Sequence, residues 1–233
     1  MRKTLSIILL VVLFAAPCWG TEAEVNISAE RGETSEAAQA IANVTLAEQI
    51  AELGRAQRSP LLLASAAQIL NSAGTFAEEQ REKAETEGEA EGDKAAPARI
   101  ASTPESLYAE AIAAAKDQGD AALTAILESQ ARVGGTRGLV GGARVHNDRV
   151  IGRDVYNLRF YGERRAVIQL LGDGDDIEIY IFDSNGNLIT SDANGISTVR
   201  HVTWTPRWTG DFRVVIVNPG NGVPYVDYRI TTN

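Results

Sequence analysis

The spacing of hydrophobic residues changes once, near residue 132, and this change constrains the fold more than any other feature. Before it, apolar residues such as Leu46, Ile50 and Leu53 recur every three or four positions, a spacing that predicts amphipathic helices. After it, apolar and polar residues alternate in short runs, as in residues 177–182, which predicts half-buried strands. We therefore predict an α plus β chain with two domains, N-terminal helical hairpins followed by a C-terminal antiparallel β-sandwich.

Two short signals predict where helices begin in the first part. Ser59-Pro60 and Thr103-Pro104 each place an N-cap residue before a proline, and proline is favoured at the first helical position because its missing N–H is not needed there. We expect four short helices, in two pairs, within residues 44–131. The arrangement is vaguely similar to tetratricopeptide-like hairpins, although no consensus repeat recurs at a fixed period.

The first twenty residues have the pattern of a signal peptide. Arg2 and Lys3 precede an apolar run, residues 5–16, that is too short to span a bilayer comfortably. We predict removal of residues 1–20, a periplasmic or secreted location, and no transmembrane segment in the mature chain. Cys18, the single cysteine, is either a lipidation site or is removed with the leader. In the second case disulfides and thiol catalysis are excluded.

Charge is distributed unevenly along the chain. The net charge is −9, and residues 21–130 hold 20 acidic but only 8 basic residues. This balance argues against nucleic acid as a partner. We expect residues 21–43 to be disordered. Within the helical region, residues 78–99 are rich in Glu, Ala, Gly and Lys without an apolar stripe, which favours a solvated acidic linker over an acidic binding tail.

Beyond a linker at residues 132–142, several short motifs follow one another in a characteristic order. They are Asp154-Val-Tyr156, the run Gly172 to Asp183, Asn185-Gly186, Trp204-Thr-Pro206 with Thr209-Gly-Asp-Phe212, and a closing Tyr228. This order, over about residues 140–233, resembles the bacterial pre-peptidase C-terminal (PPC) domain. The resemblance implies a jelly-roll-like sandwich at residues 143–233 that is usually non-catalytic and is attached to secreted proteins. Some of the domains that it resembles bind calcium.

Calcium is the candidate cofactor, and we expect no other. Ca²⁺ takes six to eight oxygen ligands from carboxylates and carbonyls, and four candidate ligands lie in or near Gly- and Asn-containing turns: Asp173, Asp175, Asp176 and Asp183. The alternative is that Asp, Asn and Gly occur there because they form tight turns. Asp183-Ser-Asn-Gly-Asn is a hairpin signal that needs no metal.

Other candidate functional residues are few. Trp208, Arg164 and Arg165 are candidates for a ligand-binding surface, because an aromatic ring and paired guanidinium groups suit polymers and acidic partners. We expect Trp204, by contrast, to be mostly buried. His146 and His201 are the only histidines, and no hydrolase motif surrounds either of them. We predict no catalytic residues.

These patterns predict an exported, non-enzymatic binding or accessory protein of the bacterial envelope. The helical region would contact a partner, and the sandwich would bind a ligand or polymer. The partner is an unknown protein or polymer. One alternative is a calcium-dependent adhesion module. A second alternative is an uncharacterised hydrolase, in which a histidine would lie beside an acid and a nucleophile in a pocket.

Overall fold

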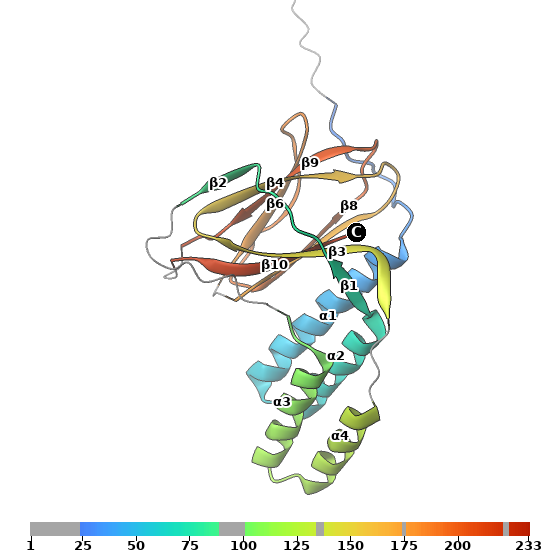
Figure 1. The fold of residues 1–233 in the computed structure, drawn as a ribbon, viewed down its shortest axis with the longest axis vertical. Helices are drawn as coiled ribbons and strands as arrows, with labels where there is room; N and C mark the ends of the chain where they lie inside the picture. Colours follow the sequence, from blue (N-terminus) through green and yellow to red (C-terminus); the bar gives the residue numbers. More distant parts are fainter. Residues whose placement is uncertain (1–23, 89–100, 134–137, 174–175, 221–223) are drawn as a thin grey trace, which may run out of the picture.

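The computed structural model places four helices beside two five-stranded sheets (Figure 1). It describes residues 24–88, 101–133, 138–173, 176–220 and 224–233. The helices are α1 (Glu36–Gln57), α2 (Pro60–Ala73), α3 (Pro104–Asp117) and α4 (Ala121–Val133). The strands are β1 (Thr75–Glu78), β2 (Glu85–Glu87), β3 (Leu139–Val150), β4 (Arg153–Phe160), β5 (Ala166–Gly172), β6 (Glu178–Asp183), β7 (Leu188–Asp192), β8 (Val199–Trp204), β9 (Gly210–Val217) and β10 (Val226–Thr232).

The helices begin where their capping residues predict. Ser59 caps α2, and its side chain accepts a hydrogen bond from the Leu62 amide. Thr103 caps α3 and forms a reciprocal capping pair with Ser106. Both predicted starts are confirmed. The helices form a stack in which α2 packs against α1 and α3, and α4 packs against α3. Among the described residues, no helix is both long enough and apolar enough to cross a membrane.

Strands β3 to β10 form a sandwich with the strand order of a jelly roll. Sheet one runs β1-β3-β10-β5-β8 and sheet two runs β2-β4-β9-β6-β7. Without β1 and β2, each sheet has four antiparallel strands. Strands that follow each other in the chain lie in different sheets, except for the β6–β7 hairpin, and this is the arrangement of two Greek keys. The inward side chains form one core that includes Tyr156, Ile168, Ile179, Trp204 and Phe212. The predicted sandwich and the buried position of Trp204 are confirmed.

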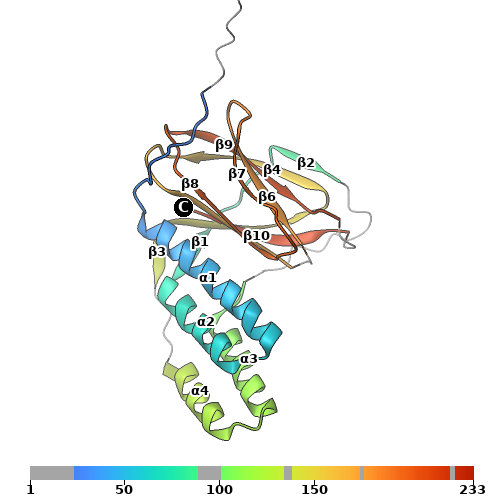
Figure 2. The same cartoon turned by 180° about the vertical axis from the view of Figure 1, so that it is seen from behind.

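Strand β5 is buried on both faces, and among the strands of the sandwich it is the one in which every residue is buried. Ile168 and Leu170 point into the sandwich core, whereas Val167 packs against the alanine-rich first half of α1. Helix α1 therefore covers the outer face of sheet one (Figure 2). The helix starts at Glu36, ahead of the predicted position at residue 44. The earlier start follows from tertiary packing, since small alanines fit closely against the sheet.

The first part of the predicted acidic linker, residues 78–88, is ordered and belongs to the sandwich. Strand β1 pairs in parallel with β3 at the edge of sheet one, and β2 pairs with β4 at the edge of sheet two. The connecting segment crosses from one sheet to the other. Its side chains are mostly polar, so hydrogen bonds and ion pairs hold it rather than a hydrophobic stripe. Residues 78–88 are mostly exposed, but they pair with β3 and β4 instead of forming the predicted linker, and residues 89–99 lie outside the described residues.

The N-terminal segment is also ordered from residue 24, so the prediction of disorder over residues 21–43 is wrong for its described part. Asn26 is 1% exposed. Its amide side chain donates to the Trp208 carbonyl at 3.1 Å and accepts from the Trp208 N–H at 3.0 Å. Its own N–H donates to Asp183. Specific hydrogen bonds, which leave no periodic signal in the sequence, therefore hold this segment against the sandwich.

Other boundaries also differ from the prediction. Helix α4 ends at Val133 and β3 begins at Leu139, so the predicted linker at 132–142 is shorter at both ends, with residues 134–137 outside the described residues. The predicted signal peptide, residues 1–20, also lies outside the described residues.

Asn26→Ala should lower the free energy of unfolding by about 2 kcal/mol, because it leaves two backbone groups of Trp208 without their partner. Urea denaturation followed by tryptophan fluorescence measures this change. Asn43→Ala on α1, where the side chain accepts one solvent-exposed hydrogen bond, is the matched control, with an expected change below about 0.5 kcal/mol. Equal effects of the two substitutions would contradict the anchoring role of Asn26.

Candidate binding face and buried clusters

The aspartates predicted to bind calcium have separate protein partners in the structure. Asp183 accepts hydrogen bonds from the backbone amides of Asn26, Asn185 and Asn187 and from the Asn187 side chain. These bonds outweigh burial, which acts in the opposite direction, and lower the pKa of the Asp183 carboxyl. Its two oxygens thus organise the β6–β7 turn and the N-terminal segment, which agrees with the turn-forming alternative.

Asp173 and Asp176 bond to different parts of the sandwich. Asp173 accepts from the Asp227 amide at 2.8 Å. Asp176 forms a 2.6 Å ion pair with Arg200, whose side chain is 2% exposed. Asp175 lies outside the described residues. Within the described ranges, no group of three or more His, Cys, Asp or Glu side chains is placed to hold a metal ion.

Arg200 is a structural residue that the sequence analysis did not identify. Its guanidinium donates to the carboxylates of Asp176 and Asp192 and to the carbonyls of Ile177, Asn194 and Gly195. It therefore joins the loops before β6 and after β7. The sequence carries a signal for this position, because strand alternation puts Arg200 on the same face as the core residues Val202 and Trp204.

The residues predicted to form a ligand-binding surface lie near one end of the sandwich. Trp208 is half-buried in the β8–β9 loop, and its backbone lies so close to Gly162 that a Cβ on that glycine would meet the Trp208 Cα at 2.8 Å. Arg164 is exposed and stacks over Tyr161 at 5.5 Å. Arg165 donates to Thr203 Oγ1 at 2.9 Å. The N-terminal segment crosses this end, since the backbone of Glu33 forms an isolated parallel β-bridge with the backbone of Arg164.

The two histidines lie in different surroundings. His146 is 4% exposed and contacts Asp148 through Nε2 at 3.3 Å. His201 lies on the outer side of β8, where burial and the neighbouring Arg165 lower its pKa. The Tyr156 hydroxyl lies beside His146, because both side chains contact Oδ2 of Asp148. Burial raises the pKa of Tyr156 far above its ordinary value of 10.0, so this phenol remains protonated and serves as a hydrogen-bond donor.

A buried polar network joins the two sheets where β3 passes into β4. Lys83 lies between Asp148 Oδ1 at 3.1 Å and Asp154 Oδ2 at 2.9 Å, and also donates to the Arg149 carbonyl. The Tyr156 hydroxyl lies within hydrogen-bond distance of Asp148, the Tyr228 hydroxyl lies within hydrogen-bond distance of Asp154, and the two hydroxyls are also adjacent. Because each phenol has one proton to donate, the two tyrosines make two of these three hydrogen bonds at a time. The tyrosines and Asp154 belong to the PPC-like motifs. Lys83 lies in the acidic segment, where no sequence pattern singled it out.

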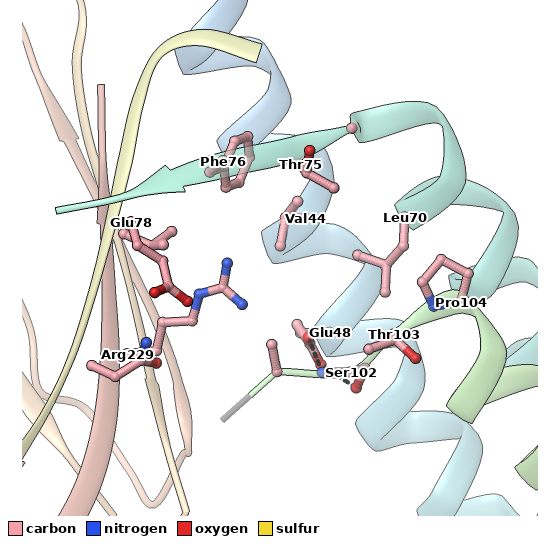
Figure 3. A pocket seen from close by; sticks show the side chains of 14 residues that line it. Val44, Glu48, Leu70, Thr75, Phe76, Glu78, Ser102, Thr103, Pro104 and Arg229 are labelled. Carbon is pink, nitrogen blue, oxygen red and sulfur yellow. Dashed lines mark hydrogen bonds between the residues drawn. The ribbon is translucent and has the colours of Figure 1, made fainter. Parts of the chain in front are cut away.

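A cavity of about 340 Å³ lies at the junction between the helices and sheet one. Figure 3 shows the side chains of Glu78 and Arg229 pointing toward each other on the sheet side, with Val44 and Leu70 on the helix side. Glu48 accepts hydrogen bonds from the Ser102 N–H and hydroxyl. This contact anchors the start of α3 to α1. The lining combines apolar walls with fixed polar groups, and no histidine is among its residues.

The outer face of sheet two carries apolar side chains that none of the four described helices covers, because these helices pack on the other sheet (Figure 1). Tyr180 and Phe182 of β6 lie opposite Val215 and Arg213 of β9, and Phe182 also lies opposite Leu188 of β7. Leu188 is 54% exposed. We define the outer sheet-two face as Tyr180, Phe182, Leu188, Val215 and Val217, of which Leu188 is exposed, Tyr180, Phe182 and Val217 are half-buried, and Val215 is buried.

Charged pairs lie beside and on this face, because Arg213 of the central strand β9 lies opposite Phe182. Arg213 forms a 2.6 Å ion pair with Glu85, and Arg153 pairs with Glu87. Tyr180 donates to Glu178 at 2.8 Å, and this hydrogen bond raises the pKa of the phenol. An apolar centre with a polar rim is the arrangement that protein-binding surfaces use. Sequence alternation alone places Tyr180 and Phe182 on one face, but it does not say whether that face is covered.

Lys83→Met should lower the free energy of unfolding by about 3 kcal/mol, because it leaves the fully buried Asp154 carboxylate without its cation. Chemical denaturation measures the change. The matched control is Lys116→Met, which removes an exposed ion pair to Glu128 between α3 and α4 and should change stability by less than about 1 kcal/mol. If Lys83→Met is no more destabilising than the control, the network does not join the sheets.

The stability should depend on the protonation of Asp148. Burial would raise the pKa of this carboxyl, but hydrogen bonds from His146, the Arg149 amide and Tyr156 outweigh it and lower the pKa. A carboxyl with a lowered folded-state pKa stabilises the fold above its unfolded pKa of about 4, and this contribution is lost as the pH falls through the folded-state pKa.

The difference in unfolding free energy between the wild type and Asp148→Asn should therefore be largest near neutral pH and shrink as the pH falls below about 4. Urea titrations at a series of pH values measure this difference. A difference that stays constant from neutral to acidic pH would show that the charge of Asp148 does not contribute.

Comparisons with known proteins give only a weak structural link. No protein-family model matches the sequence, and no curated protein matches it. The pre-peptidase C-terminal domain of a collagenase from Bacillus anthracis matches with 17% identity over 38% of this chain and 87% of that domain, at a TM-score of 0.31. A de novo designed double-stranded β-helix matches with 12% identity over 39% of this chain and 99% of its own, at a TM-score of 0.26.

Proposed function

We propose that the protein is an exported, non-enzymatic binding protein of the bacterial envelope. The sandwich holds an extended polypeptide on its outer sheet-two face, and the helical region contacts a partner. The observation that carries the proposal is the asymmetry of the sandwich. Helix α1 covers the outer face of sheet one, while Tyr180, Phe182 and Leu188 on the outer face of sheet two are not covered by a helix.

The chemistry of this face favours a polypeptide over a glycan. Val215, Val217 and Leu188 are aliphatic and offer no hydrogen bonds, so they would leave sugar hydroxyls unsatisfied. Apolar side chains of a peptide would instead bury area against them and against the two aromatic rings. The pairs Arg213–Glu85 and Arg153–Glu87 beside and on this face carry both signs of charge and suit a peptide with a mixed sequence.

The calcium-dependent and hydrolase alternatives have less support from the geometry. The described candidate calcium ligands Asp173, Asp176 and Asp183 each bond to a different protein partner. His146 lies in the buried network rather than in the junction cavity.

The chain from residue 21, labelled with a fluorophore, should bind a subset of an array of 15-residue peptides tiled from envelope proteins. Tyr180→Ser and Phe182→Ser should each weaken binding by at least about fivefold, because each removes aromatic contact area. Tyr161→Ser, an aromatic that is 63% exposed outside this face, is the matched control and should leave binding unchanged.

Sedimentation with peptidoglycan sacculi provides the second arm of the experiment. If the protein bound no peptide but bound sacculi in a manner that depends on Tyr180, the ligand of this face would be a glycan and not a polypeptide. Binding that is lost in Tyr161→Ser but kept in Phe182→Ser would move the site to the end of the sandwich near Trp208.

A further inference from the structure

The α1–α2 hairpin exposes large aliphatic side chains, and Figure 2 shows the two helices that carry them side by side. Leu46 and Leu53 of α1 are 48% and 47% exposed, and Leu61 of α2 is 62% exposed. Ile50 on α1 and Leu62 and Ile69 on α2 are partly exposed, and Ile50 and Ile69 also pack against the core of the helical stack. We call these six residues the outer hairpin face: Leu46, Ile50, Leu53, Leu61, Leu62 and Ile69.

Helical periodicity places these residues on one surface. Leu46, Ile50 and Leu53 follow the spacing of four and three that defines a single helix face. The two helices meet closely at Gly54, where an added Cβ would lie 3.2 Å from the Cβ of Leu62. On the opposite side of α1, Glu48 bonds to Ser102 and Arg55 bonds to Glu110 of α3. The most exposed members of the outer hairpin face, Leu46, Leu53 and Leu61, therefore point away from the rest of the helical stack, whereas Ile50 and Ile69 also reach its core.

This surface lacks charge, although the chain has a net charge of −9. Only four residues between 37 and 73 are charged. Glu48, Glu52 and Arg55 bond to Ser102, Thr198 and Glu110, respectively, and Arg58 caps the end of α1. The exposed polar residues around the outer hairpin face are neutral: Gln39, Gln49, Gln57, Ser65, Gln68 and Ser72. Depletion of charge is typical of the central part of protein interfaces.

We propose that the outer hairpin face is a dimer interface that binds the same face of a second copy of this chain. A two-fold contact places one surface against itself, so any net charge on that surface would be repeated across the interface and would repel. Two copies of a neutral aliphatic surface can pack against each other without repulsion between like charges, whereas two copies of an acidic surface would repel. The two hairpins would then pack as a four-helix assembly of the kind that ridges-into-grooves packing allows.

The size of the surface fits a reversible dimer. The part of α1 from residue 39 to residue 57 is about 28 Å long, and two helices about 9 Å apart form a face about 20 Å wide. One copy then offers about 550 Å², and two copies bury about 1,100 Å², which is near the lower limit for a specific interface. We therefore expect dissociation in the micromolar range rather than an obligate dimer.

Other occupants fit the surface less well. A charged partner helix would find no opposite charges on it. A membrane-surface helix carries Lys and Arg beside its apolar residues, and none flanks this face along the length of the hairpin. The inference deepens the partner contact of the proposed function by naming the partner. It does not require the peptide site on sheet two.

The test is sedimentation velocity of the chain from residue 21 across low micromolar to near-millimolar concentrations. The wild type should shift from monomer to dimer. The double variant Leu46→Glu, Leu53→Glu should raise the dissociation constant by at least about tenfold, because the new charges face each other across the two-fold axis. The control is Ile126→Glu, Ile196→Glu, which adds the same two charges at residues that are 54% and 76% exposed and lie outside both proposed faces.

Circular dichroism checks that both double variants keep the helical content of the wild type, so that loss of the dimer is not loss of the fold. A wild type that stays monomeric throughout, or a Leu46→Glu, Leu53→Glu variant that dimerises as well as the control, would overturn the proposal. So would flotation of the wild type with anionic phosphatidylglycerol vesicles that depends on Leu46 and Leu53. The samples contain no peptide, so a failure of peptide binding leaves this result unaffected.

Discussion

Strand β5 has apolar side chains on both faces, so the outer face of sheet one has to be covered by another part of the chain. Helix α1 provides the cover, because its run of alanines allows the backbone to approach the sheet closely. The second half of the same helix continues beyond the sheet and forms the first member of the helical stack. This single packing contact therefore positions the helical part and leaves sheet two as the free face of the sandwich.

Polar contacts fix the edges and ends of the sandwich, which the hydrophobic core does not reach. The sandwich core holds the sheets together in the middle, whereas the β3–β4 edge depends on Lys83 between two aspartates and on two tyrosine hydroxyls. At the end where the β8–β9 loop lies, the Asn26 side chain binds the backbone of Trp208. Such buried polar groups are costly when unpaired, so they specify where each segment lies. The outer hairpin face and the outer sheet-two face belong neither to the sandwich core nor to these buried polar contacts.

Local signals predicted the elements whose cause is local. Ser59 and Thr103 cap helices through their own side chains, and alternation in β6 reports a sheet with one buried face. The ordered segments at residues 24–34 and 78–88, which lie against the sandwich, were not predicted. Their hydrogen-bond partners are more than fifty residues away in the sequence, and their composition matches that of disordered segments. The aspartates were ambiguous because turns and calcium sites use the same residues in the same loops.

By itself, the sequence determined the starts of α2 and α3, the alternating strands and the two-part α plus β architecture, because periodicity and capping act over a few neighbouring residues. The spacing of Leu46 and Leu53 predicted an apolar side of α1 that amphipathic packing would bury, whereas the structure leaves these residues 48% and 47% exposed. Only the tertiary structure decided which sides of the helices are covered. That choice depends on which surfaces fit one another, as α1 fits sheet one, and on where distant charges such as Lys83 and Asp154 meet.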